Sequence, residues 1–222
     1  KQWNALKLLN EKGEFVSAND GNEILRIAEE ENFEYAQIDD LGVLEKKDYL
    51  HNHINAILAL PSVDVESVKS SKLKVVVDAV NSSGGIYLPA LLEAMGVEVV
   101  KLYCDPTGEF PHNPEPLPEH LHDLCSLVVA SNADLGFVVD PDVDRLAIVS
   151  EDGSLFGEEY TLVAVADYIL QLKKGNTVSN LSSTRALYDV SKFHGVNYFA
   201  SAVGEVNVVE KMKEVDAVIG GE

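Results

Sequence analysis

The chain has 222 residues, of which 46% are hydrophobic, and a formal net charge of −20 at pH 7. Its apolar fraction is enough for a buried core and excludes an intrinsically disordered chain, while the negative charge argues against nucleic acids and anionic membranes as partners. The sequence contains no membrane-length apolar run and no signal-peptide pattern, and its two cysteines fit a reducing cytoplasm.

The N-terminal part of the sequence predicts helices joined by polar segments. Residues 3–9 are rich in apolar side chains with no capping residue before them, and residues 19–22 are suited to cap a helix over 23–32. Apolar residues at helical spacing predict a second helix over 47–60. The proline and polar residues that follow, over 61–71, predict a linker.

From residue 73 onward, short apolar strands alternate with helical segments. We expect strands at 73–77, 97–102, 135–139, 146–150, 177–181, 196–199 and 217–219, and helices at 86–95, 120–130, 158–172, 184–194 and 206–213. Residues 106–118 hold five of the eight prolines and predict a loop. The alternation indicates an α/β fold whose layers are repeated in at least two units.

The sharpest local feature is an acidic loop, Asp-Pro-Asp-Val-Asp-Arg, at residues 140–145 between two apolar strands. Two carboxylates about 4 Å apart repel each other by roughly 4 kcal/mol at an effective dielectric constant of about 20. A divalent cation removes this repulsion, and the oxygen ligands of Asp140, Asp142 and Asp144 indicate a hard ion such as Mg²⁺. Arg145 adds a donor suited to phosphate oxygens, so the loop indicates phosphoryl-transfer chemistry.

Other interpretations of the acidic loop stay open at this point. In a calcium EF-hand loop the three aspartates would hold the first, third and fifth positions, but Arg145 stands where that loop needs glycine and the flanks are strands. An aspartyl phosphatase would use Asp140 as its nucleophile, although its Asp-x-Asp pair would follow the first strand of the domain. The loop could also be a non-catalytic divalent-cation-binding module or a charged surface turn.

The acidic loop also carries a resemblance to a known family. Residues 137–145, FVVDPDVDR, resemble the metal loop of the α-D-phosphohexomutases, which is usually Asp-Gly-Asp-x-Asp-Arg, with Pro141 in place of the glycine. Residues 3–7, WNALK, resemble the segment after the catalytic serine loop, and residues 183–190 and 203–212 resemble the start of the third domain. The final VIGGE resembles the opening of the sugar-binding loop.

The resemblance implies an isomerase of carbohydrate metabolism. Phosphoglucomutases, phosphomannomutases and phosphoglucosamine mutases are intramolecular phosphotransferases that interconvert hexose 1-phosphates and hexose 6-phosphates. A phosphoserine donates its phosphoryl group to a hexose monophosphate, the bisphosphorylated sugar turns over in the site, and the other phosphate returns to the serine. Such an enzyme is a phosphoprotein that requires Mg²⁺ as its cofactor.

The resemblance also implies roles for five residues of the N-terminal segment and the acidic loop. The magnesium ligands would be Asp140, Asp142 and Asp144. Arg145 would contact the phosphoryl group during its transfer, and Lys7 matches the active-site lysine, a candidate for proton transfer to or from the sugar hydroxyl. Without the resemblance, Lys7 is more simply interpreted as a surface lysine.

Three residues stand at substrate-contact positions of the family, and two more concern a phosphate contact. Glu222, preceded by Gly221, matches the glutamate that accepts hydrogen bonds from sugar hydroxyls. Glu205 stands where phosphomannomutases have histidine and phosphoglucosamine mutases have aspartate, and an acid there favours an amino sugar because a carboxylate pairs with an ammonium group. Ser182 replaces a phosphate-contacting lysine of another branch, and Arg185 is a candidate to compensate for it.

The resemblance further implies three-layer α/β/α domains with mixed sheets, one complete domain flanked by two partial ones. Residues 1–61 would be the C-terminal remnant of domain 1, residues 62–154 domain 2 with the metal loop, and residues 155–222 the N-terminal part of domain 3. The catalytic serine would precede Lys1, so we expect this fragment to lack mutase activity without the missing domains of its own full-length chain. The expected partner is a hexose phosphate, with neither nucleic acid nor membrane.

Overall fold

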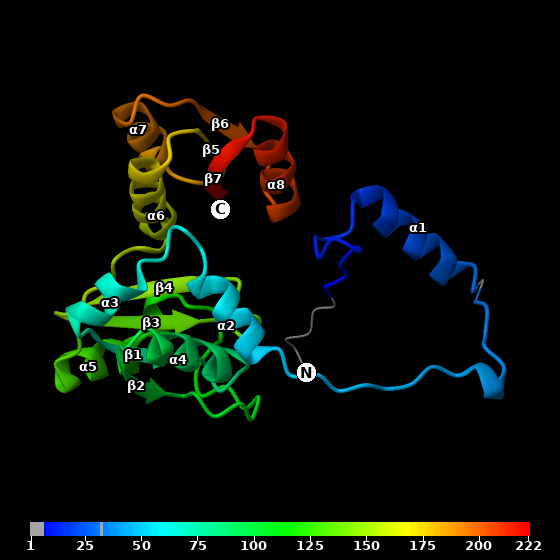
Figure 1. Ribbon diagram of the computed structural model, residues 1–222, viewed down its shortest axis with the longest axis horizontal. Coiled ribbons are helices and arrows are strands. Elements are labelled where there is room, and N and C mark those ends of the chain that lie inside the picture. Colours follow the sequence, from blue (N-terminus) through cyan, green and yellow to red (C-terminus); the bar gives the residue numbers. More distant parts are fainter. Residues whose placement is uncertain (1–6, 32) are drawn as a thin grey trace.

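The computed structural model describes residues 7–31 and 33–222 (Figure 1). An N-terminal segment with one α-helix leads into a unit with a four-stranded sheet and then into a unit with a three-stranded sheet. None of the helices in the described part of the chain is long and apolar enough to cross a bilayer.

The N-terminal segment contains helix α1 (Ala18–Glu29) and the short 3-10 helix η1 (Ile38–Asp40). Helix α1 starts earlier than expected, because the side chain of Ser17 accepts a hydrogen bond from the backbone N–H of Asp20 and caps the helix there. The helical pattern at residues 3–9 lies mostly outside the described residues, and Leu9 is not helical but pairs with Phe15 in an isolated antiparallel bridge.

The middle unit begins with helices α2 (Leu50–Leu58) and α3 (Val65–Ser71). The prediction of a linker over 61–71 is therefore wrong in its second half. The Asp64 carboxylate accepts the N–H of Ser67 at 2.9 Å and caps α3, while Lys72 adopts a left-handed conformation with φ of 52° that ends it. These local signals outweigh the polar composition of the segment.

Four strands, two flanking α-helices and a short 3-10 helix form the rest of the middle unit. They are β1 (Lys74–Asp78), α4 (Gly84–Ala94), β2 (Glu98–Leu102), the 3-10 helix η2 (Pro118–His120), α5 (His122–Ser131), β3 (Leu135–Val139) and β4 (Leu146–Ser150). The strand order is β2-β1-β3-β4, with the first three strands parallel and β4 antiparallel to β3. The sheet is therefore mixed, as the sequence predicted.

Two apolar clusters lie on opposite faces of this sheet. Val75 and Val77 of β1 point to one face and pack with Leu92 of α4. Val76 points to the other face and packs with Leu124 of α5. Because successive side chains of a strand alternate between faces, the fully buried valines of β1 serve both cores. This confirms the three-layer α/β/α arrangement.

The last unit repeats the same plan with a smaller sheet. It contains α6 (Glu158–Leu172), β5 (Asn176–Asn180), α7 (Ala186–Phe193), β6 (Tyr198–Ser201), α8 (Glu205–Glu214) and β7 (Ala217–Gly221). The strands are parallel in the order β6-β5-β7, with α6 and α7 on one face and α8 on the other (Figure 1). All of these elements agree with the predicted ones to within about two residues.

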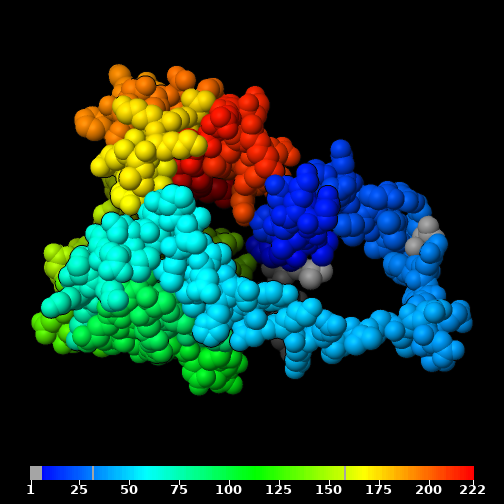
Figure 2. Space-filling model, viewed as in Figure 1, coloured from blue at the N-terminus to red at the C-terminus, as the bar shows by residue number. Residues whose placement is uncertain are grey.

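The N-terminal segment lies against α8 of the last unit (Figure 2). Lys213 of α8 and Glu14 form an ion pair at 2.7 Å across this contact. The segment also leaves many large apolar side chains exposed, among them Tyr35, Ile38, Val43 and Leu44, which are each at least 82% exposed. The two sheet-containing units contact each other through α6 and β4, and the hydroxyl of Tyr168 donates to the carbonyl of Ser62.

Candidate functional site

The acidic loop follows β3 at its carboxyl end and returns into β4. The Asp140 side chain is 6% exposed, and its Oδ1 accepts the backbone N–H groups of Asp144 at 3.1 Å and Arg145 at 3.2 Å. The loop therefore wraps around one carboxylate oxygen of Asp140. The hydroxyls of Ser82 and Ser83 donate to the carbonyl of Pro141 at 2.7 and 3.0 Å and fix the loop to the start of α4.

The structure brings the three predicted metal ligands together. One carboxylate oxygen from each of Asp140, Asp142 and Asp144 lies within 4.8 Å of the other two. Burial, followed by the neighbouring carboxylates, raises the pKa of Asp140 to about 6. Burial acts in the same direction on Asp142, but the hydrogen bonds to Lys7 and Asp140 and the charge of Lys7 together outweigh it and lower the pKa of that carboxyl. A half-exposed cluster of this kind fits a hard divalent cation, which accepts oxygen ligands and keeps part of its water shell.

Lys7 comes from the N-terminal segment and contacts two of these carboxylates. Its Nζ lies 3.3 Å from Oδ2 of Asp142 and 3.5 Å from Oδ2 of Asp144. The hydrogen bond and the charge of Asp142 raise the pKa of Lys7, so the lysine is an ammonium ion here. All three side chains are nearly half exposed, so these ion pairs contribute little to stability. Their importance lies in bringing a cation to the acidic cluster.

Arg145 has an ion-pair partner that the sequence reasoning missed. Its Nη1 donates to Oε1 of Glu115 at 2.6 Å, and Glu115 lies in the proline-rich segment between β2 and α5. The carboxylate raises the pKa of Arg145 further above its ordinary value. In the sequence, Glu115 stands out only as an acidic residue between Pro114 and Pro116. That pattern does not by itself indicate a partner 30 positions away.

A cleft of about 710 Å³ lies between the middle and last units. It is large enough for a small phosphorylated ligand. Its lining includes Asp144 and Arg145 from the acidic loop and Gly221 and Glu222 from the chain end. Other polar lining residues are Glu115, Glu159, Thr161, Asn180, Ser182 and Ser183. Gly221 and Glu222, two of the predicted substrate-contact residues, thus line the same cleft as Arg145, the predicted phosphate contact.

Two polar features of this cleft were also missed at the sequence level. Asn180, at the carboxyl end of β5, accepts the N–H and hydroxyl groups of both Ser182 and Ser183 on its Oδ1 at 2.8–3.1 Å. Thr161 has a buried Oγ1 with no hydrogen-bond partner among the described residues. An Asn followed by two serines after a strand is a signal for such a turn.

The structure places Glu205 and Arg185 outside this cleft. Glu205, the first residue of α8, lines a separate cavity of about 430 Å³ between α8 and the N-terminal segment. The Arg185 guanidinium lies 5.1 Å from the ring centre of Tyr188 and pairs with Asp189 at 3.2 Å. The Glu222 side chain nevertheless lies close to Glu205 in the fold. Its Oε1 accepts the backbone N–H of Gly204, the residue before Glu205, at 2.6 Å.

Two family models match the chain. The model described as phosphoglucomutase/phosphomannomutase, alpha/beta/alpha domain II, matches residues 49–153, and the model for alpha/beta/alpha domain III of the same family matches residues 157–222. The two matches coincide with the four-stranded and three-stranded units of the structure.

Individual relatives agree with these matches. A phosphoglucomutase/phosphomannomutase of Thermococcus kodakarensis is 33% identical over 100% of this chain and 48% of its own length. A probable phosphoglucosamine mutase of Methanopyrus kandleri is 34% identical over the same shares. The crystal structure of a phosphoglucomutase/phosphomannomutase family protein from Burkholderia thailandensis superposes with a TM-score of 0.80 at 28% identity, covering 93% of this chain and 44% of that one.

The chain spans about half the length of the curated relatives it matches. The two family models and the solved structure with the same fold indicate one and the same family. The chain belongs to the phosphoglucomutase/phosphomannomutase family.

Proposed function

We propose that this chain is the metal-binding and sugar-binding part of a phosphohexomutase. The longer protein would interconvert hexose 1-phosphates and hexose 6-phosphates through a phosphoserine and a bisphosphorylated sugar. The observation that carries this proposal is the acidic triad, whose three carboxylates converge within 4.8 Å beside the cleft that Arg145 and Glu222 line. Positioning and charge stabilisation of this kind are what phosphoryl transfer requires.

We propose Mg²⁺ as the cation of the triad, with Asp140, Asp142 and Asp144 as its protein ligands. The donor set fits, because three carboxylate oxygens at one side of a cleft leave positions for water and phosphate oxygens. When bound, the cation supplies neutralisation of the charge on the phosphoryl oxygens. We expect its affinity for this chain alone to be weak, and sub-micromolar binding of Mg²⁺ would count against the assignment.

The remaining roles belong to the chain's own side chains. Arg145 binds the phosphoryl oxygens with the N–H groups that Glu115 leaves free. Lys7 holds a proton next to the acidic triad and exchanges it with the sugar hydroxyl. Glu222 accepts hydrogen bonds from the sugar hydroxyls, and Gly221 lets the substrate approach the backbone. Arg185 would add a phosphate contact only after it leaves Asp189.

The proposed division of labour follows the two units. Residues 62–154 form domain 2, residues 1–61 the end of domain 1 and residues 155–222 the start of domain 3. The family match at 157–222 supports the second boundary, whereas the match at 49–153 begins one residue before α2, ahead of the proposed first boundary. We propose that the enzyme works in the cytoplasm and that these residues alone have no mutase activity.

Glucosamine phosphate is the proposed preferred substrate, with mannose or glucose phosphate as the alternatives. Support comes from Glu205, whose carboxylate would pair with the ammonium group of the sugar, and from the relative named phosphoglucosamine mutase. Glu205 directly follows Gly204, whose N–H binds Glu222, so a sugar held by Glu222 lies near it. Its position in the neighbouring cavity requires a shift of the start of α8 when substrate binds.

The substrate proposal is tested by Glu205→Gln in the longer protein. We expect kcat/KM for glucosamine 1-phosphate to fall about tenfold, because the neutral amide loses the charge of the pair, while the values for mannose and glucose 1-phosphates change little. Steady-state kinetics with the three sugars measures the ratio. Glu210→Gln on the same helix is the matched control. An unchanged ratio would refute the amino-sugar preference and leave the mutase assignment standing.

A further inference from the structure

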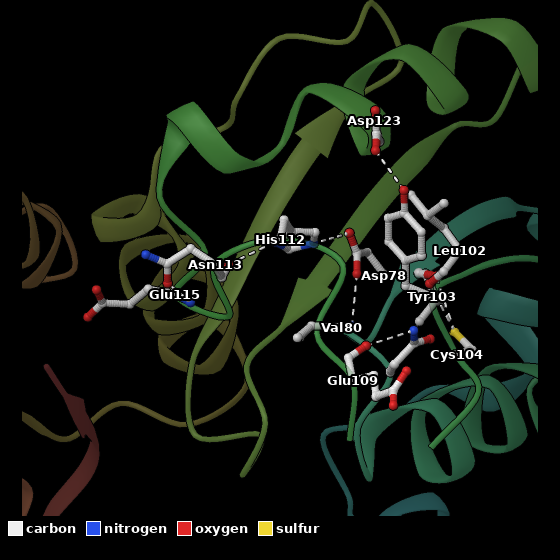
Figure 3. A network of polar contacts seen from close by, with 12 residues as sticks. Asp78, Val80, Leu102, Tyr103, Cys104, Glu109, His112, Asn113, Glu115 and Asp123 are labelled. Atoms are coloured by element: carbon white, nitrogen blue, oxygen red, sulfur yellow. Dashed lines mark hydrogen bonds and ion pairs between the residues drawn. The ribbon is translucent and has the colours of Figure 1, made fainter. Parts of the chain in front are cut away.

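A second buried acidic residue of the middle unit lies outside the metal triad. Asp78, the last residue of β1, is 1% exposed. Its Oδ1 accepts the backbone N–H of Val80 at 2.9 Å, and its Oδ2 lies 3.0 Å from Nε2 of His112 (Figure 3). His112 belongs to the proline-rich segment 106–118, so this contact joins that segment to the central strand of the sheet.

Both ring nitrogens of His112 face acceptors. Nε2 faces the Asp78 carboxylate, and Nδ1 lies 2.7 Å from the backbone carbonyl of Asn113 (Figure 3). Neither partner can donate a proton, so the imidazolium ion, with an N–H at each nitrogen, satisfies both contacts at once. The hydrogen bond to Asp78 accordingly raises the pKa of His112, against the opposing effect of its burial.

The other groups around the ring also favour its positive charge. Tyr103, after β2, packs edge-on against His112 with the ring centres 5.9 Å apart. The Tyr103 hydroxyl donates to Asp123 of α5 at 2.7 Å, and the charge of Asp123 acts on His112 in the same direction as that of Asp78 (Figure 3). The charged groups facing His112 from β1 and α5 are thus both carboxylates.

A short and stiff link joins His112 to Glu115. Asn113 accepts the N–H of Glu115 on its own side chain at 3.1 Å, and the buried prolines Pro114 and Pro116 fix the backbone on both sides of Glu115. The Glu115 carboxylate then meets Nη1 of Arg145 at 2.6 Å. A short segment of backbone thus connects the contact at Asp78 with the ion pair between Glu115 and Arg145.

We propose that His112, held by Asp78, is a positioning residue that keeps Glu115 on Arg145 and so aims the guanidinium into the cleft shared by Asp144 and Glu222. Arg145 spends one N–H on Glu115 and keeps the others for phosphate oxygens. A guanidinium that is already oriented loses less conformational freedom on binding than one free in solvent. Only the expected change in kcat/KM rests on the proposed phosphoryl-transfer function.

The first test measures the tether itself in the 222-residue chain. We expect His112 to titrate above its ordinary pKa of about 6.5. The amides of Asn113, Glu115 and Leu117 should then lose protection, measured relative to their intrinsic exchange rates at each pH, as pH rises and the ring loses its charge, because the neutral ring loses one of its two contacts. His112→Gln should lower this protection about tenfold at pH 6 and remove the pH dependence of the protection. His122→Gln, an exposed histidine of α5, should leave the exchange unchanged. Unaltered exchange in His112→Gln would refute the tether.

The second test measures the coupling to Arg145 in the longer protein. We expect His112→Gln to lower kcat/KM for the hexose phosphate by roughly 10- to 100-fold, the usual effect of a displaced catalytic group. In an Arg145→Ala background the same substitution should cause no further loss. An equal loss in both backgrounds would show a merely structural role and overturn the proposal.

Two arrangements keep these tests decisive. If His112→Gln does not fold, Asp78→Asn combined with His112→Gln removes the uncompensated buried charge and takes its place in both experiments. If the longer protein shows no mutase activity, the proposed function fails, while the exchange measurement still decides whether His112 holds the segment of Glu115.

Discussion

We expect Asp142→Asn to lower the kcat of the longer protein by about 10²–10³-fold, the usual loss when one charge-stabilising group of an active site is removed. Asp142 contributes one of the three oxygens of the triad, and its side chain is 48% exposed. The substitution keeps the shape of the side chain and removes its charge. We therefore expect the fold to be unchanged and the loss to appear in activity and metal binding.

The loss of the Lys7 contact does not explain such an effect. Lys7 keeps Asp144 as a partner at 3.5 Å, and exposed ion pairs of this kind contribute little to stability. Asp152→Asn, an exposed carboxylate in the turn after β4, is the matched control and should leave kcat and the Mg²⁺ requirement unchanged. Full activity of Asp142→Asn with an unaltered Mg²⁺ requirement would mean that the triad is not the metal site.

Asp140→Asn has two opposite expected effects. In the 222-residue chain without metal at pH 8, we expect it to raise the free energy of unfolding by about 2 kcal/mol, which corresponds to a rise in Tm of about 5 °C. The amide keeps an oxygen that accepts the N–H groups of Asp144 and Arg145. It removes a carboxylate that is buried beside two others. In the longer protein the same substitution should abolish mutase activity.

The pH dependence of this effect follows from the direction of the pKa shift. The folded-state pKa of Asp140 is raised to about 6, above its value in the unfolded chain, so the protein is favoured with the carboxyl protonated. That stability is fully present below about pH 4 and is lost as pH rises through about 6. The advantage of Asp140→Asn should therefore be large at pH 8 and vanish near pH 4.

Thermal unfolding at the two pH values, with and without Mg²⁺, measures both halves of this expectation. Mg²⁺ should stabilise the unsubstituted chain at pH 8 and leave the Tm of Asp140→Asn unchanged, because the variant has lost a ligand. Asp39→Asn, an exposed carboxylate of the N-terminal segment, is the control and should behave as the unsubstituted chain. A lower Tm for Asp140→Asn at pH 8 without metal would contradict the repulsion described for the triad.

The regular elements were predictable because their signals are local. The strands β3 and β4 and the helix α6 match the predicted bounds to the residue, since each is an apolar run with a clear periodicity. Helix α3 was missed because its cap depends on one hydrogen bond, which the Asp64 side chain accepts from the backbone N–H of Ser67. The start of α1 was misplaced for the same reason, since Ser17 and a nearby Asn are equally suited to cap a helix.

The candidate site likewise contains contacts within one loop, which were predictable, and contacts between distant residues, which were not. The triad was found because its aspartates lie at i, i+2 and i+4 in one loop, so their proximity follows from the sequence alone. The pairing of Glu115 with Arg145 and the tether between Asp78 and His112 join positions 30 and 34 residues apart. Their existence depends on the course of the proline-rich segment, which no periodicity specifies.

Of the residues that the resemblance supplied, the structure places some at the acidic loop and others away from it. Lys7 was matched by its sequence neighbours and lies at the acidic cluster, although 135 residues separate it from Asp142. Glu205 was matched in the same way, Arg185 was suggested only as a compensating residue, and the two line other cavities. Their roles stay predictions, because a match in sequence does not fix on which side of α8 or α7 a side chain lies.

The central claim is that the triad serves phosphoryl transfer between two positions of one sugar. Phosphorus NMR of the longer protein with hexose 1-phosphate and Mg²⁺ tests it most directly. We expect the signal of the 6-phosphate to grow at the expense of the 1-phosphate without release of inorganic phosphate, and we expect the 222-residue chain to produce neither. Release of inorganic phosphate by that chain, with Asp140 trapped as its beryllofluoride adduct, would instead establish an aspartyl phosphatase and contradict the account.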